Sequence, residues 1–451
     1  MKPVVTVAEM GAADARAAAH ADVLVTRAGT AVAQAALRLL GGGYGRRVVV
    51  VAGKGNNGAD GRVAADRLMR RGALVTVVPA AERGQGPPIL PPADLVIDAA
   101  YGTGFSGDYT APDPGDAPVV AVDIPSGVNG DTGAAGADAV RATETVTFAA
   151  WKPGLLLGEG PTRAGRVTVV DIGLDPGPVR MHLVDDGDRS WIPPRPRGAH
   201  KWQRAVWVVA GSPGMRGAAV LCSRGAQRAG AGMVRLGSPG LAAGEHPATE
   251  AVAVTLPAVG WANEVVDTLE RFGSVVVGPG LGRSSPDDVR RLVAASPVPV
   301  VVDADGLYAL GDLDAASGML AAAKAAVVLT PHDGEFARLT GSPPGADRVG
   351  AARALAHSTG AIVLLKGSPT VVAGPDGDVL LAAAGDPRLA TAGTGDVLAG
   401  VIGALTAAGV APFQAAALGA HVHGRAAALG PRLGLVAGDV AERLPAVLGG
   451  D

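Results

Sequence analysis

Short apolar runs alternate along the first half of the chain with amphipathic segments and glycine-rich turns. The apolar runs at 48–52, 73–78, 94–98 and 119–123 are typical of strands, and 60–70 has the spacing of a helix. Strands that are apolar throughout are buried on both faces, as in parallel sheets covered by helices. The first half therefore predicts an α/β domain.

The same pattern starts again after a break. Residues 185–197 are rich in charge and proline, a composition typical of linkers. Further strands are predicted at 205–210, 274–277, 298–303, 326–330 and 361–366. We therefore expect two α/β domains, residues 1–180 and 199–451, joined by a linker at 181–198. The halves share no alignable motif, which favours a fusion of different domains over a duplication.

Length and hydropathy agree with this organisation. A chain of 451 residues exceeds the size of one ordinary core. Residues 397–424 contain no Asp, Glu, Lys or Arg, but glycines and a proline interrupt them, so two buried Ala-rich helices are expected there rather than a membrane span. The N-terminus lacks a continuous apolar signal region, which predicts a cytoplasmic protein.

Composition narrows the class of ligand. Charged residues make up 18% of the chain and the formal net charge is -3, so no general electrostatic attraction to nucleic acid or to an anionic membrane is expected. Small-molecule substrates fit better. The single cysteine, Cys222, excludes a disulfide framework and a thiolate metal site, and its small apolar neighbours predict a buried position in a helix.

The most informative motif is Thr391-Ala-Gly-Thr-Gly-Asp-Val-Leu-Ala-Gly400, where a loop becomes a helix. Glycines let a phosphate approach the backbone, and the unpaired N–H groups of the first helical turn attract it. A carboxylate repels phosphate, so Asp396 is expected to take a proton from a hydroxyl that attacks that phosphate. The alternative is an Asp that only stabilises the helix N-terminus.

Four other strand-end features of the second half are expected to meet this motif. They are residues 211–219, 278–282, 330–335 and 366–370. Lys366 and the amides of 393–395 together have the charge to neutralise a diphosphate. Structural alternatives remain open: His332 as a hydrogen-bonded residue, Glu335 as a helix-stabilising one, and Lys366 as a solvated strand end.

Polar, glycine-rich loops follow three strands of the first half. They span 53–61, 98–107 and 123–133. The carboxyl ends of parallel strands form the ligand crevice of an open sheet, so the loops are expected to share one site. Asn57, Asp98 and Ser126 offer hard oxygen ligands of limited charge, which suit a monovalent or weakly held cation. Asp123 is a candidate for proton exchange, although Asp98 and Asp123 are also suited to loop capping.

These loops resemble a known family. Asn56-Asn-Gly-Ala-Asp-Gly61, Asp98 with Gly102-Thr-Gly104, and Asp123-Ile-Pro-Ser-Gly127 are similar to the signature loops of the NAD(P)H-hydrate epimerase family, the YjeF N-terminal domain. The flanking segments 6–14, 152–154 and 171–173 match as well, so the resemblance covers nearly all of the first 175 residues. It implies a Rossmann-like three-layer sandwich.

The epimerase resemblance also implies the residues of a site. The substrate would be held by Asn56, Asn57, Gly58, Ala59, Asp60, Gly102, Thr103, Gly104, Phe105, Ser106, Gly107, Asp108 and Asp123. Potassium would be held by Asn57, Asp98 and Ser126, with Asp123 as the acid/base group. Ala59 replaces the usual glycine and Lys54 a common proline, and the Ala59 methyl is expected to crowd the nucleotide slightly.

Residues 198–448 resemble the ribokinase-like ADP-dependent NAD(P)H-hydrate dehydratases. Small-molecule kinases share the Gly-Thr-Gly-Asp motif, whereas Thr330–Leu339 and the fused first domain are discriminating. Trp202 and Ala392 replace usual glycines. The resemblance implies substrate binding by Ala218, Gly280, Gly282, His332 and Asp396, and nucleotide binding by Lys366, Gly367, Ser368, Pro369, Thr370, Thr394 and Gly395. It also implies Asp396 as the base and ADP as the phosphoryl donor, with a magnesium ion.

Together, the two resemblances imply a bifunctional repair enzyme that acts on the hydrated cofactors NADHX and NADPHX. A homo-oligomer is also expected. The first domain would interconvert the R and S epimers, and the second would dehydrate the S epimer at the expense of ADP. One alternative is a vitamin or sugar kinase fused to a nucleotide-binding module. Another is a non-enzymatic metabolite-binding scaffold, which the acid/base candidates in both sites argue against.

Overall fold

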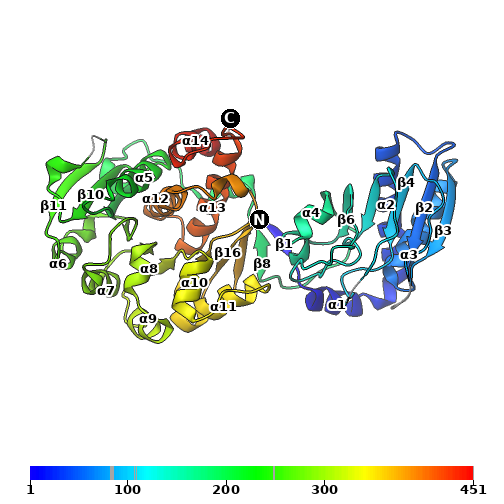
Figure 1. Cartoon of the computed structure of the whole chain (residues 1–451), viewed down its shortest axis with the longest axis horizontal. Coiled ribbons are helices and arrows are strands. Elements are labelled where there is room, and N and C mark those ends of the chain that lie inside the picture. Colours follow the sequence, from blue (N-terminus) through cyan, green and yellow to red (C-terminus); the bar gives the residue numbers. More distant parts are fainter. Residues whose placement is uncertain (82–85, 106, 108, 247–248, 450–451) are drawn as a thin grey trace. The chain divides into compact units, whose positions relative to one another are not determined.

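The chain forms two compact α/β units, as the sequence predicts. The computed structural model describes residues 1–451 except 82–85, 106, 108, 247–248 and 450–451 (Figure 1). One unit is Lys2–Val179, and the other is Arg180–Asp451 together with Met1.

The first unit is built on a six-stranded sheet in which all neighbouring strands are parallel. Its order is β3 (Leu74–Pro79), β2 (Arg47–Ala52), β4 (Leu95–Ala99), β5 (Val119–Val122), β6 (Glu144–Phe148) and β7 (Arg166–Val170). The strands β2 to β5 coincide with the apolar runs of the sequence. In β2, β4 and β5 alternate residues face two different apolar clusters, which explains why both faces of these strands are apolar, whereas β3 at the edge of the sheet is largely exposed.

Helices α1 (Val7–Arg16), α2 (Ala21–Leu40) and α3 (Asn56–Met69) contribute to one of these clusters. Gly29 of α2 allows a close approach to α3, because a Cβ there would lie 2.5 Å from the carbonyl oxygen of Asp60. Among the described residues, only 18–40 have the length and composition of a membrane span, and Ala28, Val32 and Ala36 of this stretch are buried in the core.

Strand β6 was not predicted, because its sequence, Glu-Thr-Val-Thr-Phe, is largely polar. Every residue of β6 is nevertheless buried. The carboxylate of Glu144 is paired with Arg38, at 3.2 Å, and with Arg166. Thr145 donates a hydrogen bond to the Ala164 carbonyl at 2.7 Å. Buried polar groups need such partners, and these partners are distant in the sequence.

The second unit contains a larger mixed sheet. Its strands run in the order β8 (Met181–Leu183), β17 (Val379–Ala382), β16 (Thr370–Ala373), β15 (Ile362–Leu365), β14 (Val327–Leu329), β13 (Val300–Val302), β12 (Ser274–Val277), β9 (Ala205–Val209), β10 (Met233–Pro239) and β11 (Val252–Leu256). Only β16 is antiparallel to its neighbours in this series. The five strands predicted in this half correspond to β9, β12, β13, β14 and β15.

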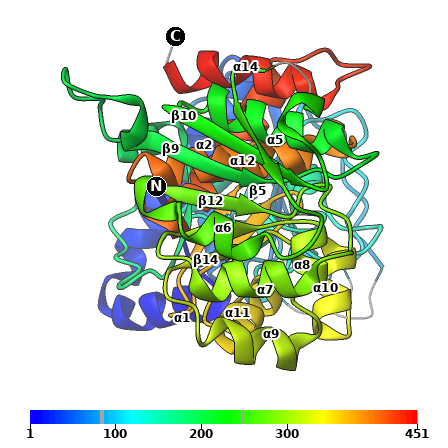
Figure 2. The same cartoon turned by 90° about the vertical axis from the view of Figure 1, so that its left-hand side faces the viewer.

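Helices cover both faces of this sheet (Figures 1 and 2). Helices α5 (Arg216–Arg228), α12 (Thr394–Ala407), α13 (Pro412–Ala428) and α14 (Ala437–Gly449) pack on one face, and α7 (Pro286–Ala295), α8 (Asp305–Ala309), α10 (Asp333–Thr340) and α11 (Arg348–Thr359) lie on the other. The predicted pair of buried Ala-rich helices is α12 and α13. Cys222 of α5 has 0% exposure, as expected.

Helices α5 and α12 touch through their backbones. A Cβ at Gly400 would lie 2.0 Å from the carbonyl oxygen of Cys222, and one at Gly225 would lie 2.3 Å from the carbonyl oxygen of Val397. Only glycine fits at such distances. This contact fixes the position of α12, whose first turn carries Asp396.

Residues 181–198, predicted as a linker, are instead largely part of the second unit. Strand β8 pairs in parallel with β17, and Asp186–Trp191 form a 3-10 helix. The Asp186 carboxylate accepts a hydrogen bond from His421 Nε2 at 2.8 Å, and Trp191 packs against the core. The charges suggested a linker because two of them have partners more than 200 residues away in the sequence: Asp186 pairs with His421, and Arg189 with the Val447 carbonyl.

Two candidate active sites

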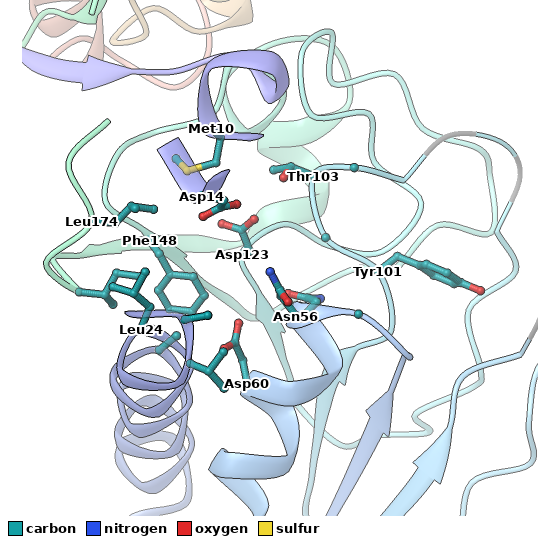
Figure 3. Close-up of a pocket in the computed structure, with 18 of the residues that line it drawn as sticks. Met10, Asp14, Leu24, Asn56, Asp60, Tyr101, Thr103, Asp123, Phe148 and Leu174 are labelled. Atoms are coloured by element: carbon teal, nitrogen blue, oxygen red, sulfur yellow. The ribbon is translucent and has the colours of Figure 1, made fainter. Parts of the chain in front are cut away.

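A cavity of about 690 Å³ opens in the first unit at the carboxyl ends of β2, β4 and β5 (Figure 3). The loops after these strands form its polar wall, as the sequence predicts. Apolar side chains form the rest, including Met10, Leu24, Phe148, Ile172 and Leu174. The cavity therefore combines a surface suited to an organic ring with a group of ionisable side chains.

Asp123 occupies an unusual backbone conformation at the end of β5. Its φ of 66° lies in the left-handed region, which non-glycine residues rarely adopt. Its Oδ1 lies 2.6 Å from Lys152 Nζ and accepts a hydrogen bond from Thr147 at 3.1 Å. Lys152 is 1% exposed and also donates to Thr147 and to the Phe148 carbonyl, each at 2.8 Å. The Asp123 carboxylate therefore has a buried cationic partner that holds it in place.

Two further carboxyl groups enter the same cavity, those of Asp14 and Asp60 (Figure 3). Burial, followed by the charges of Asp123 and Asp14, raises the pKa of Asp60 to about 8. Asp14 keeps access to solvent through the cavity, yet partial burial and the charge of Asp123 raise its pKa as well. The site thus holds one carboxylate paired with a cation and two carboxyls that retain protons more readily.

The structure brings most of the predicted substrate-binding residues to this cavity. Asn56, Asn57, Asp60, Gly102, Thr103, Gly104, Phe105 and Asp123 line it. Gly58, Ala59 and Gly107 are outside the lining, so the Ala59 methyl does not crowd this space. Ser106 and Asp108 lie outside the described residues. Asp14 and Lys152 were not predicted as site residues, although both lie in segments of the epimerase resemblance.

The three predicted potassium ligands lie at the same edge of the sheet. Ser126 Oγ donates to Asp98 Oδ1 at 2.7 Å and accepts from the Tyr101 N–H at 2.9 Å. A Cβ at Gly102, the next residue, would lie 3.5 Å from Asn57 Oδ1. The buried Asn57 Nδ2 has no hydrogen-bonding partner within the described part of the chain. Burial raises the pKa of Asp98 to about 6. An adjacent cation would offset the cost of ionising it, so the oxygen set fits a monovalent ion.

In the second unit, three strand ends meet the N-terminus of α12. Lys366 Nζ donates to Asp303 Oδ1 at 2.5 Å, and Thr330 Oγ1 donates to the same oxygen at 2.7 Å. A Cβ at Gly395 would lie 3.3 Å from Lys366 Nζ. The Lys366 ammonium is therefore adjacent to the first turn of α12. Asp303 was missed, although it ends an apolar run just as Asp98 and Asp123 do.

Asp396 lies in the first turn of α12, as predicted. Burial and then the charge of Asp303 raise its pKa to about 6, against the opposing effect of Lys366. Burial disfavours the charged form of Lys366, but Asp303 outweighs it and the Lys366 pKa is raised. A carboxylate that is ionised near neutral pH and still basic enough to accept a proton suits general-base chemistry.

The predicted substrate-binding residues Ala218, Gly280 and Gly282 also meet. A Cβ at Gly280, where φ is 58°, would lie 2.6 Å from the Ala218 Cβ. The Gly282 N–H donates to the Asp305 carboxylate at 2.9 Å. The charge of Asp305 contributes to the raised pKa of Asp396. This glycine loop therefore lies near Asp396 at the carboxyl edge of the sheet.

His332 and Glu335 support the structural alternative. Residue 332 caps α10: His332 Nδ1 accepts from the Gly334 N–H at 3.0 Å, and Glu335 Oε2 accepts from the His332 N–H at 2.9 Å. This is a capping box. The His332 side chain stays exposed, and the Lys366 N–H donates to the Pro331 carbonyl at 2.9 Å. His332 is thus held beside the Lys366 strand and remains available to a ligand.

The remaining predicted nucleotide-binding residues form two loops. Gly367, Ser368, Pro369 and Thr370 connect β15 to β16. The Thr394 hydroxyl donates to the carbonyls of Leu389 and Thr391, at 2.7 and 2.9 Å, so it shapes its own loop. His423 of α13 was not predicted. It is hydrogen-bonded to the Thr394 backbone, and burial lowers its pKa to about 4.

Comparison with known proteins assigns the two halves of the chain to two different families, in agreement with the two units of the structure. The family described as NAD(P)H-hydrate dehydratase matches residues 206–443. The family described as YjeF-related protein N-terminus matches 21–91 and 79–154. The crystal structure of the ADP/ATP-dependent NAD(P)H-hydrate dehydratase from Bacillus subtilis, with ATP and Mg²⁺, is 29% identical. It superposes with a TM-score of 0.50 over 59% of this chain and 96% of that one.

Full-length relatives carry both halves. The bifunctional NAD(P)H-hydrate repair enzyme Nnr of Salinibacter ruber is 39% identical over 479 residues, covering 89% of this chain and 87% of the relative. The enzyme of the same name from Mycobacterium tuberculosis is 42% identical over 403 residues, covering 84% and 82%. The two predicted resemblances are therefore confirmed. The chain belongs to the family of bifunctional NAD(P)H-hydrate repair enzymes.

Proposed function

We propose that this protein repairs hydrated NADH and NADPH with two active sites, one in each unit. The observation that carries the proposal is that each unit has its own carboxylate placed for proton transfer. Asp123 lies beside Lys152 in the first, and Asp396 lies beside Lys366 in the second. Membership of the bifunctional family supports the same division of labour.

In the first unit, the substrate would enter the cavity beside Asp123. Hydration places a hydroxyl on the ring carbon next to the ring nitrogen, and this carbon is the one that differs between the epimers. Exchange of the epimers requires a bond to that carbon to break and re-form on the other face. Asp123 is the proposed proton acceptor, because its carboxylate lines the cavity and is positioned by Lys152.

In the second unit, Asp396 would take the proton of the ring hydroxyl in the S epimer. The hydroxyl oxygen then attacks the terminal phosphorus of ADP, and AMP leaves. The ring nitrogen lone pair expels phosphate from the carbon, and loss of a proton from the adjacent carbon restores the dihydronicotinamide. Lys366 and the amide of Gly395 are placed to stabilise the charge on the transferring phosphate.

Two cations belong to the proposal. Asn57, Asp98 and Ser126 would hold potassium, which would supply positive charge close to the substrate loops. Magnesium would accompany the nucleotide, as in the Bacillus subtilis dehydratase crystals. Lys366, Gly367, Ser368, Pro369, Thr370, Thr394 and Gly395 remain the predicted nucleotide-binding residues. ADP is the predicted phosphoryl donor.

The direct test is recovery of reduced-nicotinamide absorbance from a mixture of R and S NADH hydrate. The mixture would receive Mg²⁺ with either ADP or ATP. Nucleotide-dependent recovery of both epimers, faster than the spontaneous rate, is the expected result. Recovery of the S fraction alone would remove the epimerase activity from the proposal, and no recovery would remove both activities.

A small-molecule kinase remains the alternative, because such kinases share the Gly-Thr-Gly-Asp motif found at residues 393–396. Product analysis separates the two. A kinase releases a stable phosphorylated alcohol, whereas the dehydratase releases inorganic phosphate and reduced cofactor. Cytoplasmic location and a homo-oligomeric state also remain predictions, and sedimentation of the purified protein tests the latter.

A further inference from the structure

Asp14 is a pocket residue whose role the comparisons do not assign. It lies on α1, and the matched part of the epimerase family begins only at residue 21. Its carboxyl points into the cavity toward Asp123 (Figure 3). In the described part of the chain this carboxyl has no hydrogen-bonding partner, so it is available to a molecule in the cavity.

Helix α1 is fixed against the site rather than loosely attached. The Val5 N–H donates to the Trp151 carbonyl at 2.9 Å, and the Trp151 N–H donates to the Pro3 carbonyl at 3.0 Å. Trp151 directly precedes Lys152, the partner of Asp123. The backbone contact therefore ties the segment leading into α1 to the residue beside the proposed proton acceptor.

Side-chain packing completes this attachment. Met10 and Ala13 of α1 are 5% and 1% exposed and belong to the core. A capping box at Thr6 and Glu9 defines the start of the helix. Asp14 follows Ala13 directly, so the core fixes the backbone that carries its exposed side chain.

The charges that face Asp14 decide which carboxyl carries a proton. Asp123 and Asp60 are negative neighbours, and Lys152 is the positive one. Lys54 also lines the cavity. Partial burial and the charge of Asp123 raise the pKa of Asp14, and Lys152, whose ammonium contacts Asp123 at 2.6 Å, opposes this less strongly. Asp14, like Asp60, therefore holds a proton more readily than an isolated carboxyl does.

Figure 3 distinguishes these two groups. Asp60 lies beside Phe148 and Leu24, on the apolar side of the cavity, whereas Asp14 points toward Asp123 from α1. A protonated Asp60 is placed to donate a hydrogen bond to the substrate. Asp14 is placed to reach the same part of a bound substrate as Asp123.

We propose that Asp14 is the second acid/base group of the epimerase site and works as the acid partner of Asp123. This inference rests on the proposed epimerase function. It adds to the site a catalytic residue carried by α1.

The chemistry requires two groups. The hydroxyl-bearing carbon is bonded to both oxygen and the ring nitrogen. Asp123 takes the hydroxyl proton, the carbon–nitrogen bond breaks with its electron pair on nitrogen, and Asp14 gives its proton to that nitrogen. The open form carries an aldehyde, whose carbon can rotate and present its other face. Ring closure reverses both proton transfers, so no net proton or electron is exchanged with solvent.

The test compares Asp14→Asn with Asp14→Glu and with Asp66→Asn, whose residue is exposed on α3 outside the cavity lining. The assay follows R-to-S exchange, corrected for the spontaneous rate, in the full-length protein. Asp14→Asn is expected to lower kcat by about 10² to 10⁴ with little change in KM. Asp14→Glu should restore part of the rate, and Asp66→Asn should match wild type.

The pH profile separates chemistry from structure. If Asp14 supplies a proton, the rate of wild-type exchange falls at alkaline pH as Asp14 ionises, and the Asn variant lacks this fall in rate. Dehydration of the S epimer remains at the wild-type rate in that variant. Exchange within threefold of wild type would overturn the inference. A rate loss with an unchanged profile and no rescue by Glu would overturn it too. Failure of the wild-type protein to exchange epimers would instead remove the proposed epimerase function, and this inference with it.

Discussion

Asp396 carries the most specific expectation at the scale of single residues. The variant Asp396→Asn keeps the shape of the side chain but cannot accept the hydroxyl proton, so dehydration should fall by about 10² to 10⁴. Phosphate release from the S epimer and ADP measures this. Epimer exchange in the same preparation is the control and should be unaffected. Wild-type dehydration by the variant would show that Asp396 is not the base.

The pH dependence of dehydration follows from the same residue. Burial and Asp303 raise the pKa of Asp396 to about 6. A general base must be ionised, so kcat/KM should rise as the pH increases through about 6 and level off above it. Asp303 contributes to this raised pKa. A rate independent of pH from 5 to 8 would contradict the assignment.

Asp123→Asn is the matching change in the first unit. The Asn side chain can still accept hydrogen bonds from Thr147 and Lys152, but it cannot take a proton. Epimer exchange should therefore slow by about 10² to 10⁴ while dehydration of the S epimer continues. Following both epimers by chromatography measures the two reactions together, and unchanged exchange would exclude Asp123 from the mechanism.

At the scale of elements, the backbone contact between α5 and α12 is a sharp structural requirement. Gly400→Ala would place a Cβ 2.0 Å from the Cys222 carbonyl oxygen, so the helices would have to separate. Overpacking of this kind costs about 1 to 3 kcal/mol, and it should also weaken dehydration by moving the first turn of α12. Thermal unfolding and dehydratase rate measure both effects.

Gly438→Ala is the control for this change, because a Cβ at Gly438 has no atom within 4 Å. It lies in α14 of the same unit, where alanine is a better helix former than glycine. Its melting temperature should equal or exceed that of wild type. Equal stability of the Gly400 and Gly438 variants would show that α5 and α12 can separate at no cost.

The elements found from sequence are those whose signal is local. The apolar runs of β2 and β9 predict buried strands, and the Gly-Thr-Gly-Asp motif predicts the start of α12. Strand β6 was not predicted from the sequence, because its polar residues are buried only where they pair with distant residues such as Arg38 and Arg166. A hydrogen-bonded structural role was expected as the alternative for His332, but its capping of α10 is visible only in the structure.

At the scale of the whole molecule, two α/β units and their family were predictable from motifs that the chain retains. The meeting of Asp60 and Asp123 was expected too, because their loops follow strands of one parallel sheet. The arrival of Asp14 was not, because it lies on a separate helix that only the fold brings to the site. Asp303 and Lys152 were missed for a related reason. Asp303 forms an ion pair with Lys366, and Lys152 forms one with Asp123, and in both pairs the partner is distant in the sequence.

The assignment of β8 to the second unit has a practical consequence for dividing the protein. A dehydratase domain produced from residue 199 would lack β8 and leave the hydrogen-bonding edge of β17 bare, whereas one produced from residue 180 would retain the pairing from Met181 to Leu183. Bare strand edges recruit other chains. The shorter fragment should therefore aggregate, and light scattering at matched concentrations would detect it. Equal solubility of the two fragments would mean that β17 tolerates an open edge.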